Sequence, residues 1–467
     1  MILLNVNNCV LDIFNSFLRI ILFVVFLSIS FSSTFISSQR PIIKLLKWDE
    51  IKKNEIIIPK VGPMFNDNLE LLNIASFYTY EVVDSHIFKF NLYPELKISD
   101  SKSPRLKING SIDIYLSKKL AIQNEFEFDN KGEQDPHFYG VERGLDNGWV
   151  GYLQHSTLTY SYQNGYYSMG RGNPYFFNFN ESLLLNSNFP PVEYFQWSHK
   201  IKYFKFDWSL MMLDGVYLNK NRINRYLIFH RYSINMNNWR IGFTEALLGL
   251  YDSFGNRELG YVMPASSLLE TEENRGSNTN LMWLLDAIYK NNGWTFYGEL
   301  LLDDYALDGK SPPKLGVNVG LGMKIKRLLL NLEFTSINRW TGNHCDSLKQ
   351  WVENKIPIGH SMGADSKMIA LNSYFTINDQ FAYEVDIVIT KHNKSLSPTF
   401  VEEWPLNVKC DYNFDDKASD PLEKDISRSI SANLNYLFNE DFLGILNLLY
   451  RSDTGFSAKT SISYAFK

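Results

Sequence analysis

A strict alternation of apolar and polar residues between Trp294 and Trp340 constrains this chain more than any other feature. In the middle of this stretch, apolar side chains alternate without a break with small or polar ones: Leu315, Val317, Val319, Leu321, Met323 and Ile325 against Lys314, Gly316, Asn318, Gly320, Gly322 and Lys324. A period of two places successive side chains on opposite faces of a β-strand. The stretch therefore predicts a strand with one face toward lipid or core and the other toward water.

Two further strands flank this one. Thr295, Tyr297, Glu299 and Asp303 share one face of residues 294–303, and a similar alternation runs through residues 328–335. Only Lys326 and Arg327 separate the second strand from the third, which indicates a tight turn. The polar, proline-bearing residues 304–313 separate the first from the second. One end thus has a short turn and the other a long loop.

A soluble β-sandwich would also alternate in this way, so the alternation alone leaves two fold classes open. Three features favour an all-β, transmembrane antiparallel barrel of the outer-membrane type. They are strands of about ten residues, the contrast between short turns and long loops, and a small, polar inner face that contains Gly and Glu. The mean hydropathy of −0.21 is too low for a protein with several membrane helices.

The one long apolar run, Ile20 to Phe31, follows Arg19 and precedes several serines, which is typical of a secretory signal peptide. The alternative is an N-terminal membrane anchor, for which the run is short. We expect a signal peptide at 1–38, a periplasmic N-terminal extension at 39–85 and the barrel at 86–467. The exported chain keeps Cys345 and Cys410. A disulfide between their loops and two separate thiols both remain open.

Following the alternation and the turns along the barrel region gives eighteen strands, an even number with both ends at the short-turn side. The pattern predicts that residues 214–224 form a loop between two strands. It places the long loops at one end, which in bacterial barrels is extracellular, and the longest is 391–428.

Several motifs resemble the Wzi-type capsule-assembly proteins of the outer membrane, in the order that this family shows. They lie between Gly151 and Thr390 and comprise MGRG (169–172), SLLLNSNFPP (182–191), FHRY (229–232), GFTEALL (242–248), GELLLDD (298–304), NLEFTSINRW (331–340) and IGHSMGADS (358–366). The resemblance implies an eighteen-stranded barrel that is closed to free diffusion. It also implies a non-catalytic surface lectin that helps anchor capsular or related polysaccharide at the cell surface.

Charged and aromatic residues near the loop end of the opening strands are candidate polysaccharide-binding residues: Glu299, Asp303, Asp304, Glu333, Arg339 and Trp340. Carboxylates and Arg would orient sugar hydroxyls, and Trp would stack on a sugar ring. The alternative is a network of ion pairs inside the barrel, because every buried charge needs a polar partner. The same two interpretations apply to His230, Arg231 and Glu245. Of the first two only one can face the lumen, where Glu245 across the next hairpin would be its ion-pair partner.

Other chemistry finds little support in the sequence. The eight histidines lack metal-ligand spacing, so we expect no metal and no cofactor. No Ser, His and amide trio suggests an outer-membrane phospholipase. With a net charge of −5 and no basic cluster interleaved with aromatics, nucleic acid is not an expected partner.

We therefore expect a non-enzymatic outer-membrane protein with surface polysaccharide and outer-membrane lipid as its partners. The main alternative is a porin or substrate-diffusion channel, since a barrel of this size could enclose an aqueous pore. An outer-membrane enzyme is a third, weaker alternative. The sequence leaves the oligomeric state open.

Overall fold

The computed structural model describes the greater part of the barrel region and two short segments before it. The described residues are 56–59, 77–80, 87–97, 105–117, 119–130, 149–172, 174, 182–186, 189–218, 221–251, 261, 263, 266–275, 279–303, 314–338, 340–342, 347–353, 356–377, 381–393, 424–439, 442–452 and 455–464. The predicted signal peptide lies outside them. No helix among the described residues has the length and apolar character needed to cross a membrane.

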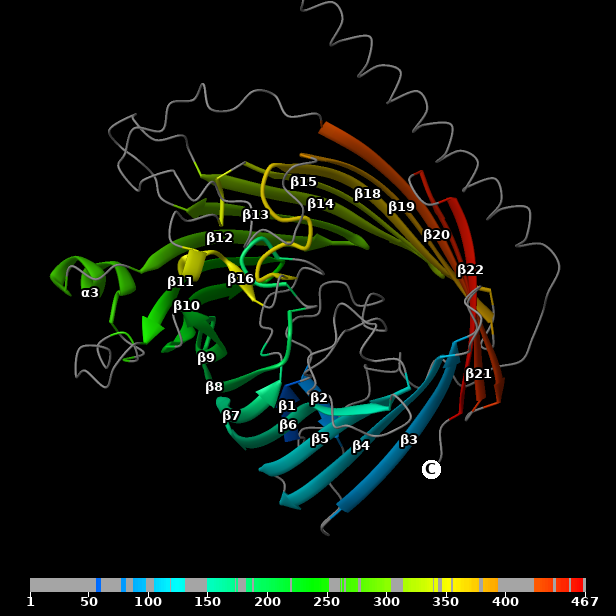
Figure 1. Ribbon diagram of the computed structural model, residues 1–467, viewed down its shortest axis with the longest axis horizontal. Coiled ribbons are helices and arrows are strands. Elements are labelled where there is room, and N and C mark those ends of the chain that lie inside the picture. The colour runs from blue at the N-terminus through cyan, green and yellow to red at the C-terminus, as the bar shows by residue number, and fades with distance from the viewer. Residues whose placement is uncertain are drawn as a thin grey trace, which may run out of the picture.

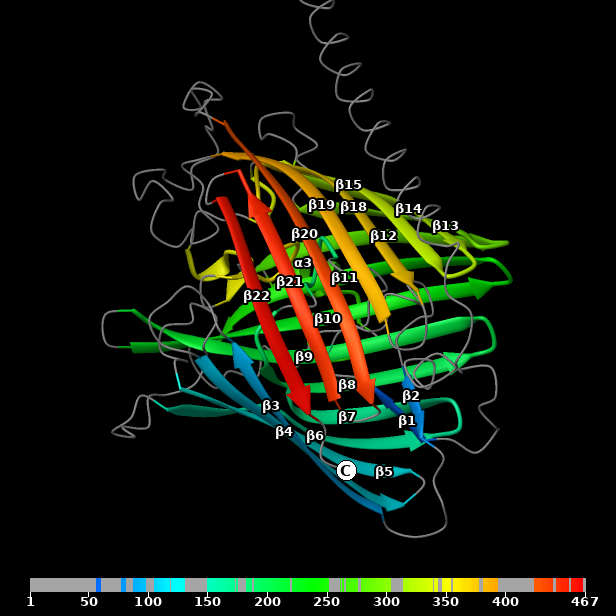
Figure 2. The same ribbon diagram turned by 90° about the vertical axis from the view of Figure 1, so that its right-hand side faces the viewer.

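Eighteen antiparallel strands form a closed barrel, as the alternation predicts. In chain order these are β3 (Ile87–Lys97), β4 (Arg105–Ser117), β5 (Leu120–Asp129), β6 (Val150–Tyr162), β7 (Gly165–Gly172), β8 (Val192–Ile201), β9 (Phe204–Leu218), β10 (Asn221–Met236), β11 (Trp239–Tyr251), β12 (Asn280–Asn291), β13 (Trp294–Asp303), β14 (Leu315–Ile325), β15 (Leu328–Ile337), β18 (Ser366–Thr376), β19 (Phe381–Asn393), β20 (Lys424–Asn439), β21 (Phe442–Arg451) and β22 (Gly455–Tyr464). Each strand pairs with its neighbour in this order, and β22 meets β3 at one register pair, Ser463 with Glu95. Figure 1 shows the ring of strands, and Figure 2 shows their strong tilt.

The two faces of β13, β14 and β15 follow the predicted alternation. Tyr297, Glu299 and Asp303 are buried inside, whereas Trp294 and Phe296 are exposed on the outer surface. The register places Glu299 opposite Asn318, and Gly320 opposite Glu333, so the inner faces of the three strands are continuous. The sheet therefore presents a polar inner wall and an apolar outer wall.

Tight turns connect consecutive strands at one end of the barrel. Lys202, Asn237, Asn292 and Lys326 lie in these turns with positive φ, as the twist of tight hairpins requires. The opposite end carries the long connections, in agreement with the sequence pattern. Two expectations there are wrong. Residues 214–224 are not a loop, because β9 continues to Leu218 and β10 begins at Asn221. The pairing of β9 with β10 extends through Ile223 opposite Val216. The longest predicted loop, 391–428, is shorter at both ends, because β19 continues to Asn393 and β20 begins at Lys424.

An aromatic cluster covers the outer wall near the tight turns. The ring centroids of Tyr167 and Trp197 lie 6.1 Å apart with nearly parallel planes, and Phe206 lies 5.5 Å from Trp197. The indole Nε1 of Trp197 donates a hydrogen bond of 2.8 Å to the hydroxyl of Tyr162. Such rings with one polar group are typical of the girdle at the edge of the membrane's apolar band.

A short helix, α3 (Leu268–Arg275), lies outside the ring of strands beside β11 (Figure 1). Its Leu268, together with Tyr261, packs against Tyr226, Ile228 and Leu247. These three residues point outward from the barrel, yet all are buried. Part of the connection between β11 and β12 therefore covers the outer wall, and this portion of the wall is shielded from lipid.

Two small sheets accompany the barrel. Strands β1 (Ile56–Pro59) and β2 (Phe77–Tyr80) pair with each other within the predicted N-terminal extension, whose boundaries stay a prediction. Strands β16 (Val352–Glu353) and β17 (Ile356–Pro357) form a short hairpin in the connection between β15 and β18. The β16–β17 hairpin belongs to the candidate functional site.

Candidate functional site

Two connections from the long-loop end turn inward and pack inside the barrel. The first lies between β7 and β8, and its described residues include 182–186 and 189–191. The second lies between β15 and β18 and contains the 3-10 helix η5 (Ser347–Lys349) and the hairpin β16–β17. The backbone amide of Asn186 donates a hydrogen bond of 2.6 Å to the carbonyl of Ile358, which joins the two connections. We call the described residues of both the lumenal plug.

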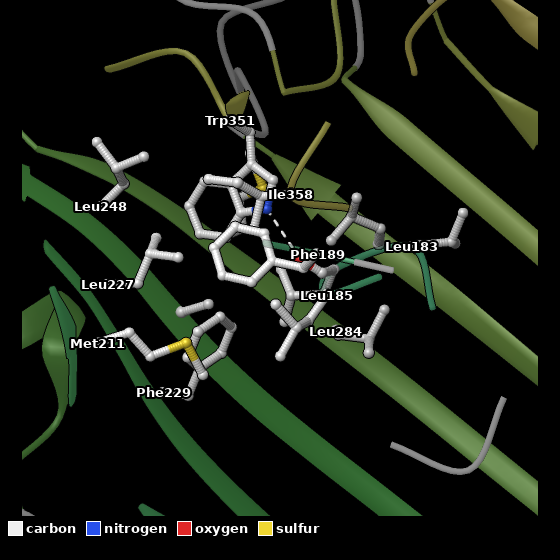
Figure 3. Packing of buried hydrophobic residues seen from close by; sticks show 14 of the residues in the cluster. Leu183, Leu185, Phe189, Met211, Leu227, Phe229, Leu248, Leu284, Trp351 and Ile358 are labelled. Carbon is white, nitrogen blue, oxygen red and sulfur yellow. Dashed lines mark hydrogen bonds between the residues drawn. The ribbon is translucent and has the colours of Figure 1, made fainter. Parts of the chain in front are cut away.

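An apolar core fixes the lumenal plug to the inner wall. Leu183, Leu185 and Phe189 from the first connection meet Trp351 and Ile358 from the second, as Figure 3 shows. The inner faces of β9 to β13 supply the matching apolar surface: Met211, Leu213, Leu227, Phe229, Ala246, Leu248, Met282, Leu284, Ile288, Tyr297 and Leu301. Burying each such side chain contributes about 1.5–3 kcal/mol, so this core holds both connections firmly.

Glu299 forms the principal polar latch on the first connection. The hydroxyl of Ser182 donates a hydrogen bond of 2.7 Å to one carboxylate oxygen, and the amide of Leu183 donates one of 2.8 Å to the other. Glu299 and Ser182 are both buried. A carboxyl group inside the barrel needs such donors, because a buried polar group without hydrogen bonds is costly. Glu299 therefore ties a loop to the wall and has no carboxylate oxygen directed to the outside.

Arg225 forms a second latch, on the connection between β15 and β18. Its guanidinium donates hydrogen bonds to the carbonyls of Leu348 (2.9 Å), Gln350 (2.8 Å) and Val352 (2.7 Å). It also pairs with the carboxylate of Glu353 at 3.2 Å, and both side chains are almost fully buried. The planar fork of Arg suits several acceptors at once, whereas Lys would supply a single ammonium group.

Two further wall residues complete the attachment of this connection. The side-chain amide of Asn280 donates a hydrogen bond of 2.9 Å to the carbonyl of Lys349. The carboxylate of Asp303 accepts one of 2.6 Å from the backbone amide of Gly342, and Asp303 is 0% exposed. Asp303 therefore fixes the beginning of the connection and is not available to a ligand at the rim.

Beneath the lumenal plug, paired charges brace the wall itself. Both terminal nitrogens of the Arg231 guanidinium donate to the Asp286 carboxylate, and the bond from Nη2 is 2.8 Å long. Nη1 also donates to the hydroxyl of Thr244 at 3.0 Å. An added Cβ at Gly242 would meet the Arg231 guanidinium and the Asp286 carboxylate. A glycine at this position therefore leaves room for the ion pair.

A third group of polar residues connects β13 with β15. The hydroxyl of Tyr297 donates a hydrogen bond of 2.7 Å to Glu333 and lies 3.0 Å from the side-chain amide nitrogen of Asn331. A Cβ added at Gly320 would collide with the Tyr297 ring, so glycine gives that ring its space. Glu333, like Glu299, therefore belongs to a buried network of the barrel.

A small cavity remains between the lumenal plug and the wall. Its volume is about 50 Å³, and Leu183, Met282, Trp351 and His360 are among its lining residues. A water needs roughly 10–15 Å³ measured in this way, so the cavity accommodates a few waters and is too small for a sugar ring. The described residues hold no group of three or more His, Cys, Asp or Glu side chains that could bind a metal ion.

The structure thus places the predicted residues in four groups, one of which, His230 with Glu245, lies on the outer face. Glu299, Asp303, Glu333 and Arg231 face the lumen and lie in the buried network. Trp340 is half-buried at the outer end of β15. Asp304, Arg339, Cys345 and Cys410 lie outside the described residues, so the disulfide stays a prediction.

The predicted lumenal position of Glu245 is wrong. It lies directly opposite His230 on the outer face, and Arg231 instead lies opposite Thr244 and pairs with Asp286. The carboxylate of Glu245 accepts hydrogen bonds of 3.4 Å from the hydroxyl of Ser267 and the amide of Leu268, at the N-terminus of α3. A negative charge is favourable there because the first helical amides have no partner within the helix.

Several residues of the site were not predicted from the sequence: Ser182, Arg225, Asn280 and Asp286. One signal could have revealed the lumenal plug. In the run YLIFH (226–230), apolar residues occupy both faces of a barrel strand. Lipid explains only one of these faces, so apolar polypeptide must cover the other.

No protein-family model matches the chain, and no curated protein matches it by sequence. Among solved structures, it is similar to Wzi of Escherichia coli, described as a carbohydrate-binding β-barrel outer-membrane protein involved in group 1 capsule assembly. The two are 13% identical with a TM-score of 0.56, over 86% of this chain and 87% of that one.

The outer membrane proteins opdK and OprD of Pseudomonas aeruginosa also match, both at 9% identity over 82% of this chain. They are covered over 100% and 93% of their length, with TM-scores of 0.49 and 0.45. The closed ring of strands and the likeness to Wzi show the fold of an outer-membrane β-barrel, in agreement with the location that the sequence predicts.

Proposed function

We propose that this chain is a closed barrel of the bacterial outer membrane that binds and anchors surface polysaccharide without catalysing a reaction. The observation that carries the proposal is the lumenal plug, which is held by Glu299, Arg225, Asp303 and an apolar core. A diffusion channel needs a continuous aqueous path, and buried leucines with charges engaged in hydrogen bonds are a poor lining for one. The likeness to Wzi, whose structure is that of a carbohydrate-binding barrel, supports the same function.

The buried network cannot itself be the sugar-binding surface, because its carboxylates are engaged either by the lumenal plug or by other residues of the barrel wall. The sugar-binding surface in this proposal is the outer rim, where Trp340 follows the last residues of β15 and is half-buried. An indole ring in that position can stack on the apolar face of a sugar, with neighbouring polar groups orienting the hydroxyls. The lumenal plug supplies a rigid base for this surface, which lowers the entropy cost of binding.

Equilibrium binding to an array of surface polysaccharides tests this function. The array holds neutral, carboxylated and phosphorylated polymers, and the full-length protein is applied in detergent. We expect saturable binding of at least one polymer, weakened about tenfold in W340A through the lost aromatic contact. The matched control is W239A, at the opposite end of the barrel, where Trp239 is 48% exposed on the outer wall. Absence of binding to every polymer, or equal binding by W340A and the intact protein, would overturn the proposal.

A further inference from the structure

Three cationic side chains gather on the outer wall at the long-loop end of β18, β19 and β20. Lys367, Lys391 and Arg428 are all exposed, and we call them the basic triad. The register fixes their direction. Lys367 lies opposite Ser336, which alternates with the inward-facing Thr335, and Lys391 lies opposite Lys367. Arg428 lies opposite Ile389, two residues from Lys391 on the same outward face.

The basic triad is electrostatically unfavourable as it stands. Directly opposite residues in an antiparallel pair have Cβ atoms about 5 Å apart, and like charges at such positions destabilise the sheet. Among the described residues no carboxylate forms an ion pair with Lys367, Lys391 or Arg428. An anion bound between the three cations would remove this repulsion.

The height of the basic triad on the barrel indicates where such an anion lies. Ten residues separate Phe381, at the aromatic end of β19, from Lys391. This corresponds to about 33 Å along the strand and, at a tilt of roughly 40°, to about 25 Å along the barrel axis, the usual height of the apolar band. The outward positions between them are Tyr383 and then the apolar Val385, Ile387 and Ile389. The basic triad therefore lies at the upper edge of the band, level with the headgroups of the outer leaflet.

Apolar side chains surround the three cations. Ile426 and Ile430, on either side of Arg428 along β20, are 54% and 47% exposed, and Tyr450 on the neighbouring strand is 48% exposed. Acyl chains can pack against these side chains while an anionic headgroup binds the cations above them. The corresponding outer ends of β13 and β14 carry the apolar Leu302 and Leu315 instead. On β7 the outward Arg171 is paired with Glu193 at 2.7 Å.

We propose that the basic triad is a binding site for the phosphate-bearing headgroup of an outer-leaflet lipid. The two lysines and the arginine bind the phosphate oxygens by charge-assisted hydrogen bonds. Ile426, Ile430 and Tyr450 contact the acyl chains. Such a lipid would occupy a fixed position on the β18–β20 wall, away from the part of the wall that α3 covers in Figure 1.

Native mass spectrometry of the full-length protein in detergent tests this site, with diphosphorylated lipid A as the probe. We expect one lipid A to bind tightly. Each cation removed should weaken binding about fivefold, and the triple variant K367Q/K391Q/R428Q on the order of 100-fold, as expected for basic side chains at a membrane surface. The control K200Q/K326Q removes exposed lysines at the tight-turn end and should bind as the intact protein does.

The variant K367E separates lipid binding from a structural role. It places a carboxylate opposite Lys391, which should raise the thermal stability of the barrel while lowering the affinity for lipid A. Equal binding of lipid A by the triple variant and the intact protein would overturn the proposal. So would competition by inorganic phosphate at the same concentration as lipid A, which would identify a free anion as the ligand. Displacement of lipid A by a soluble anionic polysaccharide would overturn it in favour of a glycan site.

Discussion

Replacing Glu299 by alanine removes the latch that holds the connection between β7 and β8 inside the barrel. The carboxylate accepts two buried hydrogen bonds, from Ser182 at 2.7 Å and from the amide of Leu183 at 2.8 Å. A buried donor left without its acceptor costs about 1–3 kcal/mol, so losing both hydrogen bonds disfavours the inward position by about 2–6 kcal/mol. Since 1.4 kcal/mol corresponds to a factor of about ten, E299A should open this connection on the order of 10- to 10⁴-fold more often.

Hydrogen–deuterium exchange followed by mass spectrometry measures this opening directly. The reporter is the amide of Asn186, which donates to the carbonyl of Ile358 and is not bonded to Glu299 itself. Its exchange should accelerate by the calculated factor in E299A, while amides in β14 keep their protection. The matched control is E193A, because Glu193 is 61% exposed and forms only a surface ion pair with Arg171. Unchanged exchange at residues 182–186 in E299A would refute the assignment of Glu299 as a latch.

Three further substitutions test the other parts of the site. R225M removes the donors to Leu348, Gln350, Val352 and Glu353 and should make residues 347–353 sensitive to proteases. R225K keeps the charge without the planar fork and should give an intermediate effect. Equal protease resistance of R225M and the intact protein would contradict the role of Arg225. D286N leaves the buried Arg231 with a neutral partner and should reduce the free energy of unfolding by up to about 3–5 kcal/mol, which lowers the thermal midpoint. The double variant R231M/D286L should recover much of this stability. A double variant no more stable than D286N would contradict this account. G320A forces a methyl group against the Tyr297 ring and should cost about 1–3 kcal/mol, measured by thermal unfolding, whereas G298A, whose Cβ would meet nothing closer than 3.4 Å, should be nearly neutral. Equal stability of the two glycine variants would show that the packing of Tyr297 does not require Gly320.

Much of the barrel could be predicted because the pattern that indicates a membrane strand lies in residues that are neighbours in the sequence. A strand with lipid on one side and water on the other must alternate, so residues 294–337 reveal both their strands and their faces. Glu299 and Glu333 were assigned to the lumen for this reason, and the structure places both there. The tight turns, including Asn292 with Gly293, were equally visible.

The lumenal plug could not be predicted in this way, because its contacts join residues far apart in the chain. Ser182 meets Glu299, and Arg225 meets the carbonyl of Gln350. No periodicity encodes such pairs. Where apolar residues occupy both faces, as in residues 226–230, alternation loses its power to distinguish inside from outside, and the error over Glu245 arose in that region.

The central claim is that the lumenal plug closes the barrel, and the conductance of the intact protein in a planar lipid bilayer tests it most directly. A variant in which a short Gly–Ser linker replaces residues 182–191 serves as the reference for an opened barrel, because it lacks Ser182, Leu183 and Phe189. We predict that the intact protein is electrically silent and that the linker variant conducts. Steady conductance by the intact protein would contradict the closed barrel and would make a diffusion channel the better description of this chain.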